Sequence, residues 1–250
     1  MEQYANNMEV GMAAFLKDIT PFLGENRVNE QGQNLEEFLQ EYNPNKYPNP
    51  SVTADVMVFW AENELKEVEK DLKLLLIRRK NHPSIGWWAL PGGFVDIRED
   101  ADAAAKRELE EETGLKNIAV EQICAWGNYN RDPRTRIVTI AYVALLENKV
   151  KVQAGDDAED AAWFHVFLKK LEEKPEDERK IEIYELNLIN PIDQTKVSAK
   201  VKYSYLDHSI LKDEKYEVLE TNHLAFDHPA FIIKGILHIA DRLKNYRKEV

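Results

Sequence analysis

The stretch that most constrains the fold of this 250-residue chain is ADAAAKRELEEETG, residues 101–114. At about 100° of rotation per residue in a helix, the carboxylates of Glu108, Glu111 and Glu112 share an arc of roughly 100°. Like charges three and four residues apart repel, and the single Arg107 cannot neutralise three glutamates. Alanines also lie on or beside this arc, where a solvated face would carry long polar side chains. The stretch is therefore either an acidic surface helix with ion pairs along it, or a helix whose acidic face meets a ligand of high positive charge.

The residues on either side of this helix define its ends and allow a ligand to come close. Asp100 is of a type that caps helix N-termini, and Gly114 is of a type that ends helices. The preceding WALPGGF places Gly92 and Gly93 in a turn where the backbone can approach a ligand. Hard divalent cations such as Mg²⁺ favour carboxylate oxygens together with water and substrate phosphates, so they suit such a site.

A complete Nudix box has the pattern G-x5-E-x7-R-E-U-x-E-E-x-G-U, where U is a bulky aliphatic residue. The chain resembles this box at Gly93, at Glu99 and along the run RELEEETGL, which begins at Arg107 and ends at Leu115. This resemblance implies an α/β protein with the Nudix fold, in which a mixed β-sheet is sandwiched between α-helices. It also implies hydrolysis, dependent on Mg²⁺ or Mn²⁺, of a nucleoside diphosphate linked to another group X.

The Nudix resemblance assigns roles to the residues that match the box. It makes Glu111 and Glu112 catalytic, and Arg107 and Glu99 would orient the carboxylates from behind. The implied metal ligands are the box glycine, through its carbonyl, and the three glutamates: Gly93, Glu108, Glu111 and Glu112. Such metals would offset the charge of a pyrophosphate and help to generate hydroxide.

Other segments resemble the Nudix branch that contains ADP-ribose pyrophosphatases and the Nudix-related transcriptional regulators of NAD metabolism. These segments are LLLIRRKNHPSIGWWALPGGFV, NRDPRTRIVTIAYVAL, AGDDAEDAAWF and LAFDH. In the regulators, LAFDH leads through a helix into a winged-helix DNA-binding domain, whereas this chain ends soon after that helix, and its box is intact. We therefore expect a pyrophosphatase of ADP-ribose or a similar nucleotide sugar without a C-terminal winged helix. The alternative is a catalytically weak ADP-ribose-binding sensor related to the regulators.

Basic and acidic residues outside the box are candidates for substrate binding and catalysis. Arg79 resembles the arginine that follows the strand before the box in this branch, and Arg131 and Arg134 of RDPR are suited to phosphate. For each of the three, the alternative is a surface ion pair. Asp157 and Glu159 lie in a loop where related pyrophosphatases often keep the general base or an extra metal contact. A flexible acidic loop explains these two almost as well.

Composition and charge limit the partners and the location of the protein. The formal charge of −12, from 33 basic and 45 acidic residues, argues against a general affinity for nucleic acid or anionic membranes. We therefore expect a small-molecule substrate and neither DNA nor membrane as a partner.

The single cysteine, Cys124, excludes an internal disulfide framework. The N-terminus lacks the features of a signal peptide, and no apolar run approaches the roughly 20 residues of a membrane span, so a cytoplasmic location is expected.

Local patterns predict an N-terminal helical extension with a linker, a Nudix domain, and a C-terminal α+β extension, spanning residues 1–50, 51–168 and 169–250. The N-terminal part contains two predicted helices, over 9–23 and 34–42, before a proline-rich linker. Whether the chain forms a homodimer in which these helices swap between subunits, as such extensions do in dimeric relatives, is left open by the sequence. In the C-terminal part, the charged segment KKLEEKPEDERK, residues 169–180, predicts a solvated loop or short helix, and apolar spacing predicts a final helix from about His228.

Overall fold

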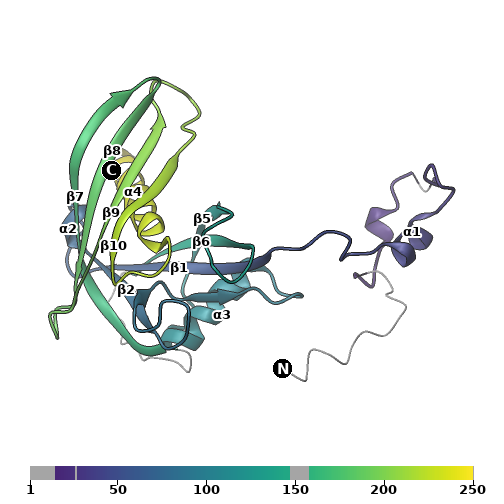
Figure 1. Cartoon of the computed structure of the whole chain (residues 1–250), viewed down its shortest axis with the longest axis horizontal. Helices are drawn as coiled ribbons and strands as arrows, with labels where there is room; N and C mark the ends of the chain where they lie inside the picture. The colour runs from purple at the N-terminus through teal and green to yellow at the C-terminus, as the bar shows by residue number, and fades with distance from the viewer. Residues whose placement is uncertain (1–14, 26, 147–157, 250) are drawn as a thin grey trace. The chain divides into compact units, whose positions relative to one another are not determined.

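The protein was analysed as a computed structural model that describes residues 15–25, 27–146 and 158–249. The chain divides into two compact units, Met1–Asn49 and Pro50–Val250, which are described separately (Figure 1). The second unit contains all the strands and the longer helices, so the fold that carries the candidate site lies there.

The N-terminal unit contains little regular structure. Its described helical elements are the 3-10 turn η1, Thr20–Phe22, and helix α1, Leu35–Glu41. The helix predicted to begin near Asn34 is confirmed, and its first turn is closed by a capping box. The helix predicted over residues 9–23 is wrong in its described part, where only η1 is helical. Pro21 lies at the start of this turn, where proline is favoured because the first helical residues have no preceding turn to which an N–H could donate.

The second unit is built on one mixed ten-stranded sheet with the order β10-β9-β8-β7-β2-β1-β6-β5, in which β3 pairs with β2 and β4 pairs with β1. Strands β1 and β6 run parallel, and the other neighbours are antiparallel. Residues 53–60 of β1 are all buried because this strand is central and covered on both faces. The strands are β1 Ser51–Ala61, β2 Leu72–Arg79, β3 Trp88–Ala89, β4 Gly92–Phe94, β5 Glu121–Trp126, β6 Ile137–Leu146, β7 Ala158–Glu176, β8 Arg179–Ile189, β9 Lys196–Leu206 and β10 Lys215–Asn222.

Two helices cover the two faces of this sheet: α3, Ala101–Thr113, and α4, His228–Glu249. In β1, Val56 belongs to the buried cluster that contains Ala104 and Ala105 of α3, whereas the next residue, Met57, belongs to the cluster on the α4 side. Successive side chains of a strand point to opposite faces, so the alternation follows from strand geometry. Figure 1 shows α4 within the curve of β7–β10 and α3 on the other side of β1. The expected α/β sandwich is confirmed, and the small side chains of α3 meet the sheet.

Helix α4 approaches the sheet closely at one glycine. A Cβ added to Gly235 would lie 2.6 Å from the sulfur of Met57, so no larger residue fits without a shift of that side chain. The helix begins where it is predicted, at His228, and its apolar face packs against both halves of the sheet. The first residues of α4 are therefore held at a defined place relative to β1.

The charged segment 169–180 forms the end of β7, a tight turn and the start of β8, so its prediction as a solvated loop or short helix is wrong. Asp177 has a φ of 52° in the turn, and Lys180 pairs with Glu173 across the two strands. Pairing with a neighbouring strand satisfies the backbone N–H and C=O groups of such a strand even when both of its faces are solvated. Its sequence therefore lacks the alternation of apolar residues that marks a buried strand. The boundary expected between residues 168 and 169 lies within β7, and the division into domains stays a prediction.

Two further elements were not predicted from the sequence. Strand β10 is an edge strand and mostly exposed, and the short helix α2, Val68–Asp71, lies in the loop expected between the first two strands. Both lack the long apolar periodicity that signals an element in a sequence. Within the described ranges, the protein has no helix with the length and apolar character to cross a bilayer.

Candidate functional site

A cavity of about 380 Å³ opens beside α3, within the second unit. Its wall is formed by parts of β1 and α3, the turn around β4, the segments after β2 and before β6, and the start of α4. This volume is in the range of small-molecule sites. Four of the six box residues with a predicted role, and all three predicted substrate-binding arginines, line this cavity; the four are Gly93, Arg107, Glu108 and Glu112.

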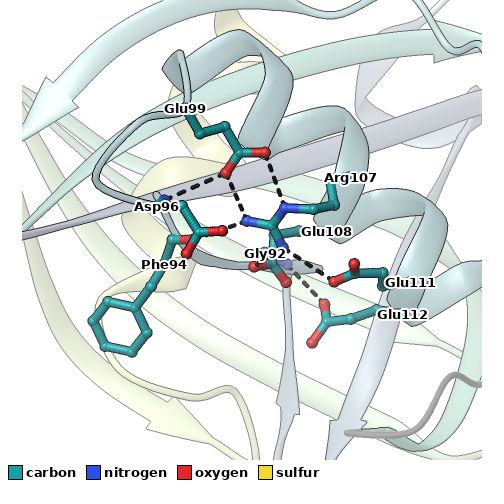
Figure 2. A network of polar contacts seen from close by, with 8 residues as sticks. All are labelled: Gly92, Phe94, Asp96, Glu99, Arg107, Glu108, Glu111 and Glu112. Atoms are coloured by element: carbon teal, nitrogen blue, oxygen red, sulfur yellow. Dashed lines mark hydrogen bonds and ion pairs between the residues drawn. The ribbon is translucent and has the colours of Figure 1, made fainter. Parts of the chain in front are cut away.

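The two glycines of WALPGGF are required by close contacts around the cavity. A Cβ added to Gly93 would lie 2.4 Å from the carboxyl carbon of Glu108, and one added to Gly92 would lie 2.2 Å from the backbone oxygen of Ala54. Gly92 also has a φ of 153°, in the region that favours glycine. Its N–H donates a 2.8 Å hydrogen bond to Oε2 of Glu112 (Figure 2). The turn therefore brings backbone against two of the predicted metal ligands.

Arg107 holds the other carboxylates of the box in one network, as Figure 2 shows. Its guanidinium donates to both carboxylate oxygens of Glu99 at 2.9 and 2.8 Å and to the carbonyl of Phe94 at 3.0 Å. The remaining donor, Nη1, reaches Glu108 at 2.7 Å and Glu111 at 3.0 Å. The hydrogen bonds from Arg107 lower the pKa of Glu99. The bonds to the carboxylates, of which the one to Glu99 has the largest effect, raise the pKa of the Arg107 guanidinium. Arg107 thus links Glu99 to Glu108 and Glu111, and the orienting role predicted for Arg107 and Glu99 stays a prediction.

The three box glutamates differ in their surroundings. Glu112 is only 9% exposed and lines the cavity, and Glu108 lines it too, whereas the side chain of Glu111 is 57% exposed and is not part of the lining. Burial raises the pKa of Glu112 to about 8, against the effect of the Gly92 N–H, and the charges of Glu108 and Asp55 raise it further. Burial also raises the pKa of Glu108, although Arg107 opposes the shift. The positive charge near Glu112 is therefore too small to offset the effect of its burial.

A divalent cation fits this donor set. The close approach of Gly93 to Glu108 and the buried carboxyl of Glu112 provide oxygen ligands, the type that hard cations prefer. Within the part of the chain that the structure describes, no three His, Cys, Asp or Glu side chains stand grouped to hold a metal ion. Arg107 instead binds Glu108 and Glu111, and Glu112 accepts a hydrogen bond from Gly92 (Figure 2). We call Glu108 and Glu112, the two glutamates that line the cavity, the acidic wall.

The lining of the cavity also includes three arginines, Arg79, Arg131 and Arg134, which we call the basic wall. Arg131 makes a bidentate ion pair with Asp227, at 2.9 Å for both bonds, and Arg134 makes one with Asp132 at 3.0 and 2.9 Å.

Arg79 is held differently from the other two arginines. It donates its Nε–H to the carbonyl of Pro83 at 2.8 Å, and its guanidinium lies 5.0 Å from the ring centre of Phe226. Burial lowers the pKa of Arg79, whereas the bonds to Asp132 raise the pKa of Arg134. All three predicted substrate-binding residues therefore lie at the cavity, each oriented by its own partner.

Two buried polar residues of the cavity were missed by the sequence reasoning. Asp55 of β1 accepts a short hydrogen bond from the hydroxyl of Thr139, and burial, opposed by this bond, raises the pKa of Asp55 to about 6. Its signal was a lone acid inside the apolar run SVTADVMVFW. His228 lies at the start of α4 and lines the cavity, and its signal was its place in LAFDH. Polar residues in such positions are informative because burial of a polar group has a cost.

The predicted loop acids cannot be placed at this cavity. Asp157 lies outside the described residues, and of Glu159 only the backbone, in β7, is described. Their role as general base or metal contact stays a prediction.

Comparisons with known proteins agree with the box. The profile of the NUDIX domain matches residues 52–186, which is more than half of the chain. The chain is 39% identical over 128 residues to the ADPR responsive transcriptional repressor NtrR of Acinetobacter baylyi, covering 50% of this chain and 49% of that protein. It is 38% identical over 119 residues to an ADP-ribose pyrophosphatase of Methanocaldococcus jannaschii, covering 47% of this chain and 63% of that protein. The match therefore leaves a large part of each curated relative uncovered.

A solved structure is similar over a greater length. The crystal structure of a MutT/nudix family protein from Enterococcus faecalis matches with a TM-score of 0.60 and 30% sequence identity. The similarity covers 85% of this chain and 71% of that one, so it extends beyond the residues matched by the NUDIX profile.

Proposed function

This chain belongs to the NUDIX family, and from that premise we propose that it is a Mg²⁺-dependent hydrolase of nucleoside diphosphates linked to a group X. The first candidate for the substrate is ADP-ribose or a similar nucleotide sugar. Water would add to one phosphorus of the pyrophosphate, the bridging P–O bond would break, and two monophosphates would leave. Mn²⁺ is the alternative metal.

The observation that carries this proposal is that buried carboxyl groups and three guanidinium groups line the same cavity. The acidic wall holds a nearly buried carboxyl, Glu112, whose pKa is raised to about 8, and the basic wall holds three guanidinium groups. A pyrophosphate carries negative charge that suits the arginines, and a divalent cation carries the positive charge that the carboxyls lack. A phosphorylated substrate together with a cation matches both walls at once.

In this proposal the metal is held by the box residues. Gly93 through its carbonyl, Glu108 and Glu112 would hold it at the cavity, and Glu111 would join after release from Arg107. When bound, the metal supplies charge neutralisation, polarisation of the phosphoryl oxygen and a lowered pKa of bound water. Arg107 holds Glu108 through Nη1 and is itself held by Glu99. Arg107 and Glu99 therefore act as positioning residues.

The remaining residues bind the substrate and handle the proton. Arg79 uses only its Nε–H on a described protein acceptor, which leaves its terminal nitrogens for phosphate oxygens. Arg131 and Arg134 are oriented by Asp227 and Asp132 and add positive charge on the same side. We assign the proton-accepting role to the loop acids, Asp157 or Glu159, because a carboxylate base need only reach the attacking water.

The choice of ADP-ribose rests on two relatives. One is named an ADP-ribose pyrophosphatase and the other an ADPR responsive repressor, and both are above 35% identical to this chain over the matched part. A common ligand in a hydrolase and a regulator supports the same ligand here. We also propose a cytoplasmic protein that forms a homodimer.

The similarity to the repressor supports a second candidate, an ADP-ribose sensor that acts through a partner protein. The net charge of −12 gives little attraction for DNA, so a direct regulator of DNA is disfavoured. A sensor would bind ADP-ribose, release no AMP in the presence of Mg²⁺, and form a stable complex with another protein.

A substrate panel tests the proposed function. Nucleoside diphosphates linked to different groups are incubated with the full chain, with Mg²⁺ or with a chelator, and the released monophosphates are detected through a phosphatase. We expect turnover of ADP-ribose that requires the metal. Glu112→Gln should lower the turnover by about 100-fold or more, and Glu111→Gln should also remove most of it, because both variants lose a metal ligand.

The matched control is Glu110→Gln, on the same helix. Glu110 is exposed and pairs with Lys116 at 2.7 Å, so its replacement should leave turnover unchanged. Equal turnover in wild type and Glu112→Gln would contradict the metal assignment. Binding of ADP-ribose without turnover would favour the sensor.

A further inference from the structure

The segment LAFDH, Leu224–His228, lies outside the residues matched by the NUDIX profile, yet two of its side chains line the cavity. These are Phe226 and His228. The cavity is therefore completed by residues from the C-terminal part of the chain, and their chemistry bears on what the cavity binds.

The segment is tied to the strand that leads into the glycine turn. The N–H of Trp88 donates to the carbonyl of His223 at 2.9 Å, and the N–H of Ala225 donates to the carbonyl of Trp88 at 2.8 Å. A third bond runs from the N–H of Leu90 to Nδ1 of His228 at 3.0 Å. Phe226 has a φ of 51°, an uncommon backbone conformation for a bulky residue, which the surrounding bonds maintain. These contacts hold the start of α4 against the cavity.

The bond from Leu90 decides the tautomer of the His228 ring. A backbone N–H can donate only to a ring nitrogen that carries no proton, so the proton of the neutral imidazole lies on Nε2. The ring is neutral because burial, together with the charges of Arg131 and Arg79, lowers the pKa of His228 to about 3. The side chain thus has one engaged acceptor and one donor.

The donor on Nε2 makes no hydrogen bond to the residues that the structure describes. His228 is only 4% exposed, its ring packs against Phe226 and Phe231, and its remaining surface belongs to the cavity. Nε2 is not among the described side-chain atoms that are fully buried without a hydrogen-bond partner, so this donor reaches open space, and for this side chain the open space is the cavity. An acceptor on a ligand in the cavity would satisfy it.

We propose that His228 is a substrate-binding residue whose Nε2–H donates a hydrogen bond to an oxygen of the nucleoside diphosphate in the cavity. This proposal rests on the proposed function for the identity of the substrate. It adds a neutral donor, supplied by the C-terminal part of the chain, to the charged donors of the basic wall. The acceptor is a phosphate oxygen or a hydroxyl oxygen of the sugar, and the two can be separated by experiment.

Two variants of His228 separate its two hydrogen bonds. In His228→Asn the side-chain oxygen can take the place of Nδ1, so Leu90 keeps its acceptor while the donor to the substrate is lost. In His228→Gln the amide nitrogen reaches toward the position of Nε2, so the donor is kept while the bond from Leu90 is lost. We expect His228→Asn to raise KM for ADP-ribose roughly five- to tenfold with kcat within about twofold, the size of one lost hydrogen bond. His228→Gln should change KM less and lower the melting temperature more.

The matched control is His223→Asn, at the position just before the segment Leu224–His228. His223 is exposed, stacks on Trp87 and is not part of the cavity lining, and its positive φ of 63° suits asparagine. It should leave KM unchanged. A KM within about twofold of wild type for folded His228→Asn would overturn the proposal and leave the hydrolase function intact.

A second measurement covers the case in which a His228 variant fails to fold. The wild-type full chain, labelled with ¹⁵N in its histidines, is titrated with ADP-ribose or with inorganic pyrophosphate, and the Nε2 signal of His228 is followed. A shift with both probes indicates a phosphate acceptor, and a shift with ADP-ribose alone indicates a sugar acceptor. Turnover of ADP-ribose without any shift overturns the role of His228. A shift without turnover supports His228 as a ligand contact while the hydrolase function fails, and neither shift nor turnover overturns both.

Discussion

The acidic wall and the basic wall of the cavity hold their charges in different ways. Each arginine of the basic wall has a fixed acceptor, either a carboxylate or a carbonyl, so this wall is oriented before any ligand arrives. Glu112, the more buried glutamate of the acidic wall, accepts a hydrogen bond from the N–H of Gly92 and from no other residue that the structure describes. Every guanidinium of the basic wall is thus held by a protein acceptor, whereas Glu112 has no cationic hydrogen-bond partner among the described residues. This difference supports the proposed ligand, a pyrophosphate bound together with a divalent cation.

The largest expected effect on stability comes from breaking the basic wall at Arg131. Arg131→Met leaves the carboxylate of Asp227, 18% exposed, without its bidentate partner, and should lower the free energy of unfolding by about 3 kcal/mol. Chemical denaturation measures the loss. In the double variant Arg131→Met with Asp227→Asn the stranded charge is removed, and most of the stability should return. Equal stabilities of the single and double variants would show that the pair does not hold the wall.

A smaller effect, on catalysis, is expected from Arg107, which organises the acidic wall. Arg107→Gln removes the common donor of Glu99, Glu108 and Glu111, so Glu108 loses its fixed position beside the predicted metal. We expect kcat/KM for ADP-ribose to fall roughly 100-fold, as for other residues that orient metal ligands. Steady-state kinetics measures this. Lys106→Gln, at the exposed neighbouring position, is the control, and a similar kcat/KM for both variants would contradict the assigned role.

The smallest effect concerns Asp55, which lines the same cavity in β1. Its ordinary pKa of 3.8 is raised to about 6 by burial, so between these pH values the folded protein holds a proton that the unfolded chain has lost. The stability that this proton confers is complete below pH 3.8 and is lost as the pH rises through about 6. Asp55→Asn cannot ionise and still offers an oxygen to Thr139. The variant should therefore be more stable than wild type by roughly 2 kcal/mol at pH 8 and equal to it at pH 3.5.

Unfolding by denaturant across this pH range, with a chelator present, tests the prediction for Asp55. The difference between the variant and the wild type should grow as the pH rises. Parallel pH profiles for the two proteins would show that Asp55 does not titrate in the folded state as proposed.

Several parts of the fold followed from local sequence patterns. Helix α3 and its ends at Asp100 and Gly114 were predicted because helical spacing and the preferences of end residues are local, although the side chain of Asp100 makes no capping hydrogen bond in the described structure. The apolar strands, such as β1 and β6, were also predicted. The hairpin of residues 169–180 was not, because its strands are charged and solvated and are held by backbone pairing with each other. Such pairing leaves no apolar period to detect.

The cavity shows the same limit of local reasoning. The three arginines were candidates from the sequence, but their orienting partners were not, since Arg131 and Asp227 are 96 positions apart. Asp55 and His228 were missed for the same reason. A lone acid in a buried strand and a histidine at a helix start become informative only when the surrounding elements show that both face one cavity.

The sequence by itself determined that Glu108, Glu111 and Glu112 lie on one side of a helix and that a glycine turn precedes it. This holds because helical rotation per residue and glycine's freedom are local properties of the chain. Only the tertiary structure decided that Glu112 is buried against Gly92 while Glu111 is exposed beside Arg107. It also decided that His228, from the far end of the chain, completes the cavity. Burial and long-range pairing depend on how the sheet and both helices pack, and no short stretch of sequence specifies that.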